Sequence, residues 1–361
     1  MADIITEIDS IGFGLYTAEE IRAMSVCLVD STKMEGSGTV YDERMGSNLE
    51  INKDCVTCEL SAEKCPGHFG HMELNHLVVN PLFFKMVTSY LRCFCVSNKC
   101  NDLLVTAEQI KLWGFSKAER ERKFDKIIEH IKKIDICNTC GQPQPKIMYS
   151  PTDNIISMVY KQKKNKVSIP ITTEEIKKVF DNVTDEQVRL LGFDPDLIHP
   201  RSYIISAMLV IPPCARPFVK ADGTMCDDDL TNQYLEIIKS NNHLRPDNPD
   251  MDEAKRTRHI NTLKFRIATL FNNSQGKAKH TTNSRPIKGI KERIVGKDGQ
   301  VRTNLMGKRV EQSGRTVIGP NPHLKLGEVG VPHQIAENLT YPERVASYNI
   351  DHLTAIVNEG K

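Results

Sequence analysis

The pattern of apolar and polar residues along the chain predicts a mixture of helices and strands. Apolar positions recur at close to helical spacing over 82–91, after a proline at Pro81 that suits the first turn of a helix. The charged segment 117–133 carries Phe124 and three isoleucines on one face, which predicts a second helix. The apolar run 203–213 is too short to cross a membrane, and it predicts a buried strand at 203–211.

Several helix starts are marked by a threonine followed three residues later by Glu or Gln, the pattern of a capping box. These pairs are Thr17 with Glu20, Thr172 with Glu175, and Thr184 with Gln187. They predict a short helix after residue 17 and helices at about 173–182 and 185–191. Longer helices are expected at about 228–241 and from about 252 to 271.

The remaining segments lack a clear helical period. Residues 31–54 are polar and contain glycine, so we expect loop and short strands there. The Gly-, Asn- and Ser-rich segment 272–284 is expected to be mobile. The last hundred residues are expected to form basic strands and turns, followed by two short helices. The prediction for the whole chain is an α+β fold.

Charge is unevenly distributed along this chain of 361 residues, which is long enough for two or three domains. The net charge is only +2, but residues 276–315 contain eleven Lys or Arg and three Asp or Glu, a balance of +8 that leaves −6 for the rest. A basic strip in a nearly neutral protein predicts contact with a polyanion. The strip lacks the aromatic residues that stack bases, so we expect it to hold a backbone rather than read a sequence.

Eleven cysteines are many for a chain whose N-terminus lacks the basic and apolar regions of a secretory signal. An odd number in such a chain argues against a disulfide framework, and the clustering of the cysteines indicates metal ligands. The first cluster is Cys55-x2-Cys58-x6-Cys65-x2-His68. Its two short spacings let tight turns aim four ligands at one Zn²⁺, and a filled tetrahedral shell predicts a structural role. His71 is an alternative to His68, and Gly67 and Gly70 suit the tight backbone.

The second cluster is split along the chain. Cys95-x4-Cys100 is followed 36 residues later by Cys137-x2-Cys140. The helix between the two pairs could return the chain and complete a second four-cysteine zinc site, with Cys93 as an alternative to Cys95. The other cysteines, Cys27, Cys214 and Cys226, are expected to be ordinary small residues. The absence of a His-Glu-x-x-His pattern argues against a zinc hydrolase.

Three stretches carry a resemblance to a known family. Cys55-Val-Thr-Cys with Cys65-Pro-Gly-His-Phe-Gly-His-Met-Glu-Leu74 resembles the zinc-bearing clamp core of the largest subunit of multisubunit DNA-directed RNA polymerases. Asn304-Leu-Met-Gly-Lys-Arg-Val310 with Ser313-x-Arg-Thr-Val-Ile318 is similar to the switch segment of that subunit. The match continues through Leu339-Thr-Tyr-Pro-Glu343 and covers nearly the whole chain. The nearest type is RNA polymerase II of eukaryotes or large DNA viruses.

The resemblance implies roles for individual residues. Cys55, Cys58, Cys65 and His68 match one clamp zinc site, and Cys95, Cys100, Cys137 and Cys140 match the other, although the family has two residues rather than four between the first pair. Residues 214–229 match the lid and 276–288 the rudder. The basic residues that match positions holding the template strand or the RNA–DNA hybrid are Lys297, Arg302, Lys308, Arg309 and Arg315.

The resemblance also implies an organisation and partners. It divides the chain into a clamp core with a zinc-binding head (1–145), clamp helices with the strand and lid (146–275), and rudder, switch and start of the catalytic domain (276–361). The family's Mg²⁺-binding motif, Asn-Ala-Asp-Phe-Asp-Gly-Asp, does not occur, so nucleotidyl transfer is expected to need a further part of the enzyme. Expected partners are template DNA, the RNA–DNA hybrid and the second-largest subunit, in the nucleus or a viral factory. The alternative is a stand-alone zinc protein that binds DNA.

Overall fold

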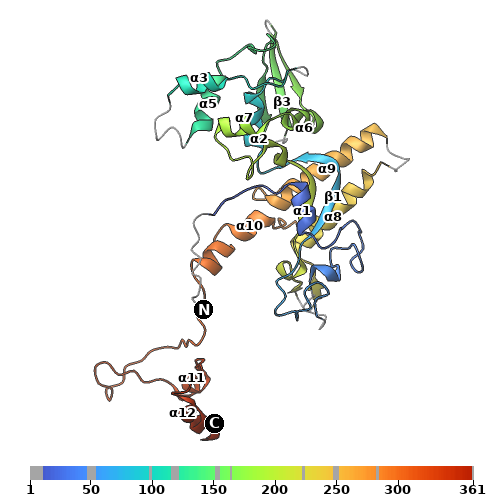
Figure 1. The fold of residues 1–361 in the computed structure, drawn as a ribbon. Helices are drawn as coiled ribbons and strands as arrows, with labels where there is room; N and C mark the ends of the chain where they lie inside the picture. The colour runs from blue at the N-terminus through green and yellow to red at the C-terminus, as the bar shows by residue number, and fades with distance from the viewer. Residues whose placement is uncertain are drawn as a thin grey trace. The chain divides into compact units, whose positions relative to one another are not determined.

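The computed structural model describes residues 11–46, 54–96, 100–114, 122–150, 155–162, 165–221, 224–246, 252–281 and 284–359. The chain forms two compact units, Met1–Ile294 and Val295–Lys361. Each unit is considered by itself. Helices and strands both occur, in agreement with the predicted α+β class (Figure 1).

Within the described residues of the first unit, the strands form three small antiparallel sheets. β1 (Gly70–Val79) pairs with β5 (Ile204–Val210), with an irregularity in register between Glu73 and Val78. The second sheet has the order β2-β3-β4 (Lys146–Ser150, Ile155–Gln162 and Asn165–Pro170), and the third is the hairpin β6-β7 (Val219–Ala221 and Thr224–Cys226). The predicted strand 203–211 is therefore confirmed as β5.

The helices of the first unit begin largely where their capping residues predicted. Capping boxes at Thr17, Thr172 and Thr184 open α1, α6 and α7, and Thr106 opens α3 in the same way without having been predicted. The helices are α1 (Ala18–Met24), α2 (Phe84–Cys93), α3 (Ala107–Leu112), α5 (Lys123–Ile131), α6 (Thr173–Asp181), α7 (Asp185–Leu191), α8 (Asp229–His243), α9 (Glu253–Phe271) and α10 (Ile290–Ile294). Short 3₁₀ turns cover Glu43–Met45, Pro200–Tyr203 and Pro213–Ala215.

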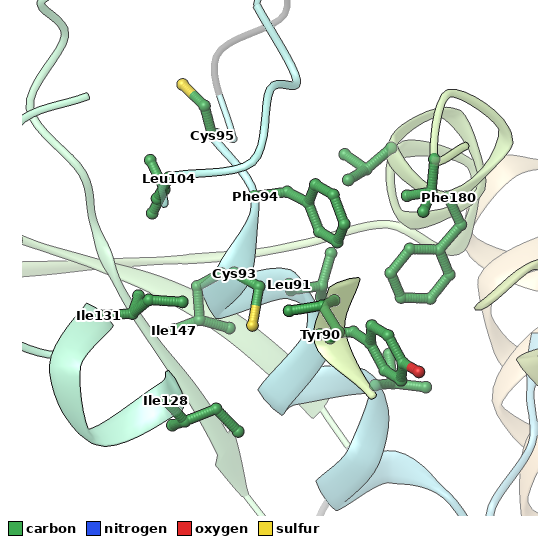
Figure 2. Packing of buried hydrophobic residues seen from close by; sticks show 14 of the residues in the cluster. Tyr90, Leu91, Cys93, Phe94, Cys95, Leu104, Ile128, Ile131, Ile147 and Phe180 are labelled. Carbon is green, nitrogen blue, oxygen red and sulfur yellow. The ribbon is translucent and has the colours of Figure 1, made fainter. Parts of the chain in front are cut away.

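Two apolar cores lie within the first unit. The first, the α2 core, packs α2 against α5, α6, α7 and strand β2, with Tyr90, Ile127 and Phe180 fully buried (Figures 1 and 2). The second, the α8 core, packs the antiparallel pair α8 and α9 against β1 and β5 and buries Tyr234 and Ile267. The ribbon β1–β5 contributes residues to both cores, Val79 to the first and Met72 to the second.

Two local predictions were wrong. Helix α2 begins at Phe84 rather than at Pro81, because the N–H of Asn80 still donates to Tyr203 O across the sheet, 2.8 Å, and the Asn80 side chain holds a turn. The mobility expected for 272–284 stays a prediction; within its described part the buried Asn273 amide donates to Ala278 O and Ile287 O at 2.8 and 2.7 Å. Over 31–46 the described chain forms turns and a 3₁₀ helix without strands.

The second unit contains helices α11 (His333–Asn338) and α12 (Ile350–Glu359), the two short helices that were predicted. It begins with a single π-helical turn, Val301–Leu305, in which Met306 N donates to Val301 O at 2.9 Å. The basic strands predicted near the end of the chain do not form within 284–359, where long stretches have no regular secondary structure.

Candidate metal centres

The loop before β1 brings the first cysteine cluster together. The ligand atoms of Cys55, Cys58, Cys65 and His68 all lie within 4.8 Å of one another. Cys58 Sγ is 3.5 Å from Cys65 Sγ, which is 3.7 Å from His68 Nε2. Four ligands around one tetrahedral Zn²⁺ would be separated by about 3.8 Å between sulfurs and about 3.6 Å between sulfur and nitrogen. The observed distances fit this arrangement.

Backbone N–H groups point at the sulfurs of this loop. Thr57 N donates to Cys55 Sγ and Gly67 N donates to Cys65 Sγ, each at 3.4 Å. Burial raises the pKa of Cys55, but N–H donors of Cys58 and Thr57, together with contacts from the Cys65 and Cys58 thiols, lower it overall. Burial and the neighbouring thiols raise the pKa of Cys65 to about 11. A cation held among the sulfurs would offset this repulsion between thiolates.

The two glycines of the first cluster serve different purposes. Gly67 has φ +81, a conformation that favours glycine, and a Cβ there would lie 2.5 Å from Cys214 Sγ. Gly70 has no positive φ; a Cβ there would lie 2.6 Å from Met45 Sδ, so glycine permits close packing instead. His71 lies outside the cluster, because its Nδ1 is 2.7 Å from Ser25 Oγ.

The second cluster also assembles, although its two halves are distant in sequence. The sulfurs of Cys95, Cys100, Cys137 and Cys140 lie within 4.8 Å of one another. Cys95 and Cys140 are 3.6 Å apart, and Cys100 and Cys137 are 3.9 Å apart, again close to the spacing of a tetrahedral shell. Burial raises the pKa of Cys137, yet N–H donors from Cys140 and Thr139 lower it overall to about 7.

The α2 core decides which of the neighbouring cysteines joins this cluster. Cys93, in the last turn of α2, is fully buried and its Sγ donates to Ser89 O at 3.3 Å. Figure 2 shows the Cys93 sulfur among the packed side chains and the Cys95 sulfur pointing away from them. Cys95 N donates to Asp102 O at 2.8 Å, which turns the chain back toward Cys100. The structure therefore favours Cys95 over the alternative Cys93.

One cysteine that was expected to be ordinary lies against the first cluster. The exposed Cys214 donates to Pro66 O at 3.4 Å, and its sulfur occupies the space beside Gly67. The sequence contained no signal for this contact, because the two residues are brought together only by the return of β5. Cys27 is buried in the α8 core, and Cys226 is exposed in β7.

A buried arginine, Arg216, holds the segment 214–229 in place. Arg216 is fully buried and donates to Ile211 O at 2.8 Å, to Thr231 Oγ1 at 2.9 Å and to Val40 O. Its guanidinium carbon lies 5.1 Å from the centre of the Tyr41 ring. Sequence reasoning missed this residue, since nothing local distinguishes it from an exposed arginine. The base of the β6–β7 hairpin is thus fixed to the start of α8.

The acidic residues at the start of α8 connect it to the basic strip. Asp228 caps the helix by accepting from Leu230 N at 2.8 Å, and it also pairs with Arg293. Asp229 accepts from Lys288 N at 2.8 Å and lies 3.0 Å from His280 Nε2. These carboxylates are therefore occupied by protein partners, in agreement with a structural role.

The predicted nucleic-acid residues belong to the second unit and are exposed. They are Lys297, Arg302, Lys308, Arg309 and Arg315. Arg302 lies in the π-helical turn, where Thr303 Oγ1 donates to Lys297 O at 3.0 Å. Lys308, Arg309 and Arg315 follow in a segment without regular secondary structure. They present positive charge along an exposed stretch of backbone, without being gathered into a single described pocket.

Comparison with known proteins agrees with this arrangement. The sequence matches two protein-family models. The family RNA polymerase Rpb1, domain 1, matches residues 5–305, and the family RNA polymerase Rpb1, domain 2, matches residues 307–361. The chain belongs to the Rpb1 family, the largest subunits of DNA-directed RNA polymerase. Both metal clusters lie within the part that matches Rpb1 domain 1.

Individual Rpb1 relatives match along almost the whole chain. A probable DNA-directed RNA polymerase II subunit RPB1 homolog of Invertebrate iridescent virus 6 is 36% identical over 437 residues, covering 100% of this chain and 42% of the relative. The DNA-directed RNA polymerase II subunit RPB1 of Euplotoides octocarinatus is 34% identical, covering 98% of this chain and 78% of the relative. A putative DNA-directed RNA polymerase of Frog virus 3 is 35% identical, and this chain spans 26% of its length.

Proposed function

We propose that this Rpb1-family chain forms the zinc-stabilised clamp of a DNA-dependent RNA polymerase and holds template DNA and the RNA–DNA hybrid during transcription. The observation that carries the proposal is the pair of four-residue clusters, each with its possible ligand atoms within 4.8 Å of one another, inside a chain that matches Rpb1 over nearly all its length. Nucleotidyl transfer would require the Mg²⁺-binding part of the enzyme, whose motif is not in this sequence.

Both clusters suit Zn²⁺ by the chemistry of their ligands. Thiolate and imidazole ligands favour zinc, whereas Mg²⁺ and Ca²⁺ take oxygen ligands. Cys55, Cys58, Cys65 and His68 would hold one ion, and Cys95, Cys100, Cys137 and Cys140 the other. Each ion would cross-link its segments, and the protein ligands would fill its coordination shell. The role proposed for both is structural.

The exposed basic residues suit contact with phosphates. Lys297, Arg302, Lys308, Arg309 and Arg315 contribute to the +8 balance of 276–315. Lys and Arg bind the phosphate backbone through charge and hydrogen bonds, which positions a strand without reading its bases. The buried Arg216 and the Asp228–Arg293 pair would give the lid-like hairpin and the rudder-like segment a common fixed base.

The proposed organisation follows the resemblance. Residues 1–145 would form the clamp core and zinc-binding head, 146–275 the clamp helices and lid (214–229), and 276–361 the rudder, switch and start of the catalytic domain. The second-largest subunit and other polymerase subunits would be partners, in the nucleus or in a viral factory. The described helices include none that is long and apolar enough to span a membrane.

The proposal is tested by purifying a tagged form of this chain from its source. Co-purification of other polymerase subunits is the expected result. A chain that is isolated alone and binds DNA as a monomer or dimer would overturn the proposal and favour the stand-alone zinc protein.

The template-holding role is tested in the purified complex by replacing Arg302 and Arg309 with Ala. A plot of the logarithm of the DNA-binding constant against the logarithm of the salt concentration should become less steep by about 2, because two phosphate contacts are lost. Transcription should also weaken. Lys325→Ala is the matched control, because Lys325 is a basic residue of the same unit outside the 276–315 strip. A salt dependence equal to that of the control would contradict the role.

A further inference from the structure

The second metal cluster is held differently from the first. At Cys55 and Cys65 the N–H donors to sulfur belong to the backbone two residues further on, Thr57 and Gly67. At Cys95 a donor comes from a side chain 49 positions away: Gln144 Nε2 lies 3.2 Å from Cys95 Sγ. The Cys95–Cys100 spacing is also wider than the two-residue spacing of the other pairs.

The orientation of the Gln144 amide is fixed by its other partners. Its Oε1 accepts from Val96 N at 3.4 Å, and its Nε2 also donates to Gln142 O at 3.1 Å. Because Val96 N is a donor and Gln142 O an acceptor, only one orientation of the amide satisfies both, and that orientation directs an N–H at the Cys95 sulfur. The backbone of Gln144 is anchored as well, since Gln144 N donates to Asp135 O at 2.8 Å.

We infer that Gln144 is a positioning residue for the second metal site: it fixes the Cys95 thiolate and stabilises its negative charge. Four thiolates around one divalent ion leave the centre with net negative charge, and N–H donors to sulfur reduce that charge without adding a ligand. Gln144 also accepts a hydrogen bond from Val96 N, directly beside the ligand Cys95, and so ties that backbone to the segment that follows Cys140. This inference rests on the proposed zinc site.

The test uses the full chain loaded with Zn²⁺, and separately with Co²⁺, as wild type and as Gln144→Met, which keeps the side-chain length but removes the N–H donor. Removing a residue that supports a metal ligand typically weakens metal affinity about 10–100-fold. We expect one of the two zinc ions to pass to a competing chelator about 10-fold faster in Gln144→Met. The cobalt–thiolate charge-transfer band should shift, because a hydrogen bond to sulfur changes the energy of its electrons.

Two controls show whether the changes in zinc release and in the cobalt spectrum come from Gln144 and from the second metal site. Gln142→Met replaces another glutamine two positions away and keeps the backbone carbonyl that Gln144 contacts. It should leave the rate of zinc release and the cobalt spectrum unchanged. Adding Cys58→Ser removes a ligand of the first site, so the remaining signal comes from the second.

The outcomes separate this inference from the proposed function. A wild-type chain that holds two zinc ions, with release and spectrum unchanged in Gln144→Met, overturns the role of Gln144 and leaves the zinc sites standing. A wild-type chain that holds no ion at Cys95, Cys100, Cys137 and Cys140 overturns the second zinc site and this inference with it.

Discussion

The two metal clusters have similar geometry but different relations to the apolar cores. The first is formed by one continuous loop, in which Cys58 and Cys65 are 7 positions apart, and none of its four ligands belongs to the described residues of the α8 core. In the second, Cys95 and Cys140 are 45 positions apart, and Cys95 and Cys137 are themselves buried members of the α2 core.

Because of this difference, assembly of the two metal sites should depend to different extents on packing of the apolar cores. The first loop can form most of its turns from local hydrogen bonds, such as Cys55 N to Leu60 O and Cys65 N to Ser61 O, at 2.8 and 2.9 Å. The second site exists only where α2, α5 and the segment after it are already packed. Metal binding and core packing should therefore be strongly coupled at the second site and weakly coupled at the first.

The largest expected effect compares Cys137→Ser with Cys58→Ser. Each substitution should remove one zinc ion, whose binding contributes on the order of 10 kcal/mol. Cys137→Ser should also expose the amides of α2 and α5 to hydrogen exchange, because it places an alcohol in a buried position of the α2 core. Cys58→Ser should raise exchange mainly in 55–68. The measurement is zinc content together with exchange resolved by segment.

Cys226→Ser is the control for this comparison, since Cys226 is exposed in β7 and outside both clusters. An equal reduction of hydrogen-exchange protection in the α2 core by Cys58→Ser and Cys137→Ser would contradict the expected difference. Metal binding would then be coupled to packing of that core to the same extent at both sites.

An intermediate effect is expected at the glycines next to the ligands. Gly67 and Gly141 both have positive φ, +81 and +69. Gly67→Ala would also place a Cβ 2.7 Å from Pro212 Cβ, whereas a Cβ at Gly141 would meet nothing within 4 Å. We expect Gly67→Ala to cost about 3 kcal/mol and Gly141→Ala about 1 kcal/mol, from backbone strain with and without overpacking.

The loss of stability in each variant is measured by denaturant unfolding of the zinc-loaded chain, with hydrogen exchange of the amides in each loop as the readout. An equal loss of stability from Gly67→Ala and Gly141→Ala would contradict this expectation. It would mean that Pro212 and Cys214 move aside without penalty when a Cβ is added at Gly67.

The smallest effect compares equivalent threonines. Thr57 and Thr139 occupy the same position in Cys55-Val-Thr-Cys58 and Cys137-Asn-Thr-Cys140. Thr57 Oγ1 donates to Arg44 O at 2.6 Å and ties the first loop to the 3₁₀ helix Glu43–Met45. Thr57→Val should cost about 1 kcal/mol in the stability of that loop, the typical net value of one hydrogen bond.

Thr139→Val serves as its counterpart in the second loop and should cost less. Urea unfolding of the two variants under the same zinc concentration gives the comparison. A larger loss from Thr139→Val would assign the stronger anchoring to the second loop instead.

Local patterns in the sequence predicted features whose physical cause is also local. Three capping boxes, at Thr17, Thr172 and Thr184, started helices because the bonds involved span only three residues. The four side chains proposed as ligands of the first cluster could be named for the same reason, since two short turns are enough to bring their ligand atoms within 4.8 Å of one another. The strand at β5 followed from a continuous apolar run.

Other features were decided by contacts between distant segments, which no local pattern records. Cys93 and Cys95 are both buried in the α2 core, but the Cys93 sulfur donates to Ser89 O within α2, whereas the Cys95 sulfur lies with those of Cys137 and Cys140. His71 is bonded to Ser25 and lies outside the first cluster. Arg216, Cys214 and Gln144 had no local signal, because their partners lie far away in sequence. The sequence by itself determined the local turns and the kinds of metal ligand. Only the tertiary structure decided which side chains complete and support each site, because packing selects among neighbouring residues of the same chemistry.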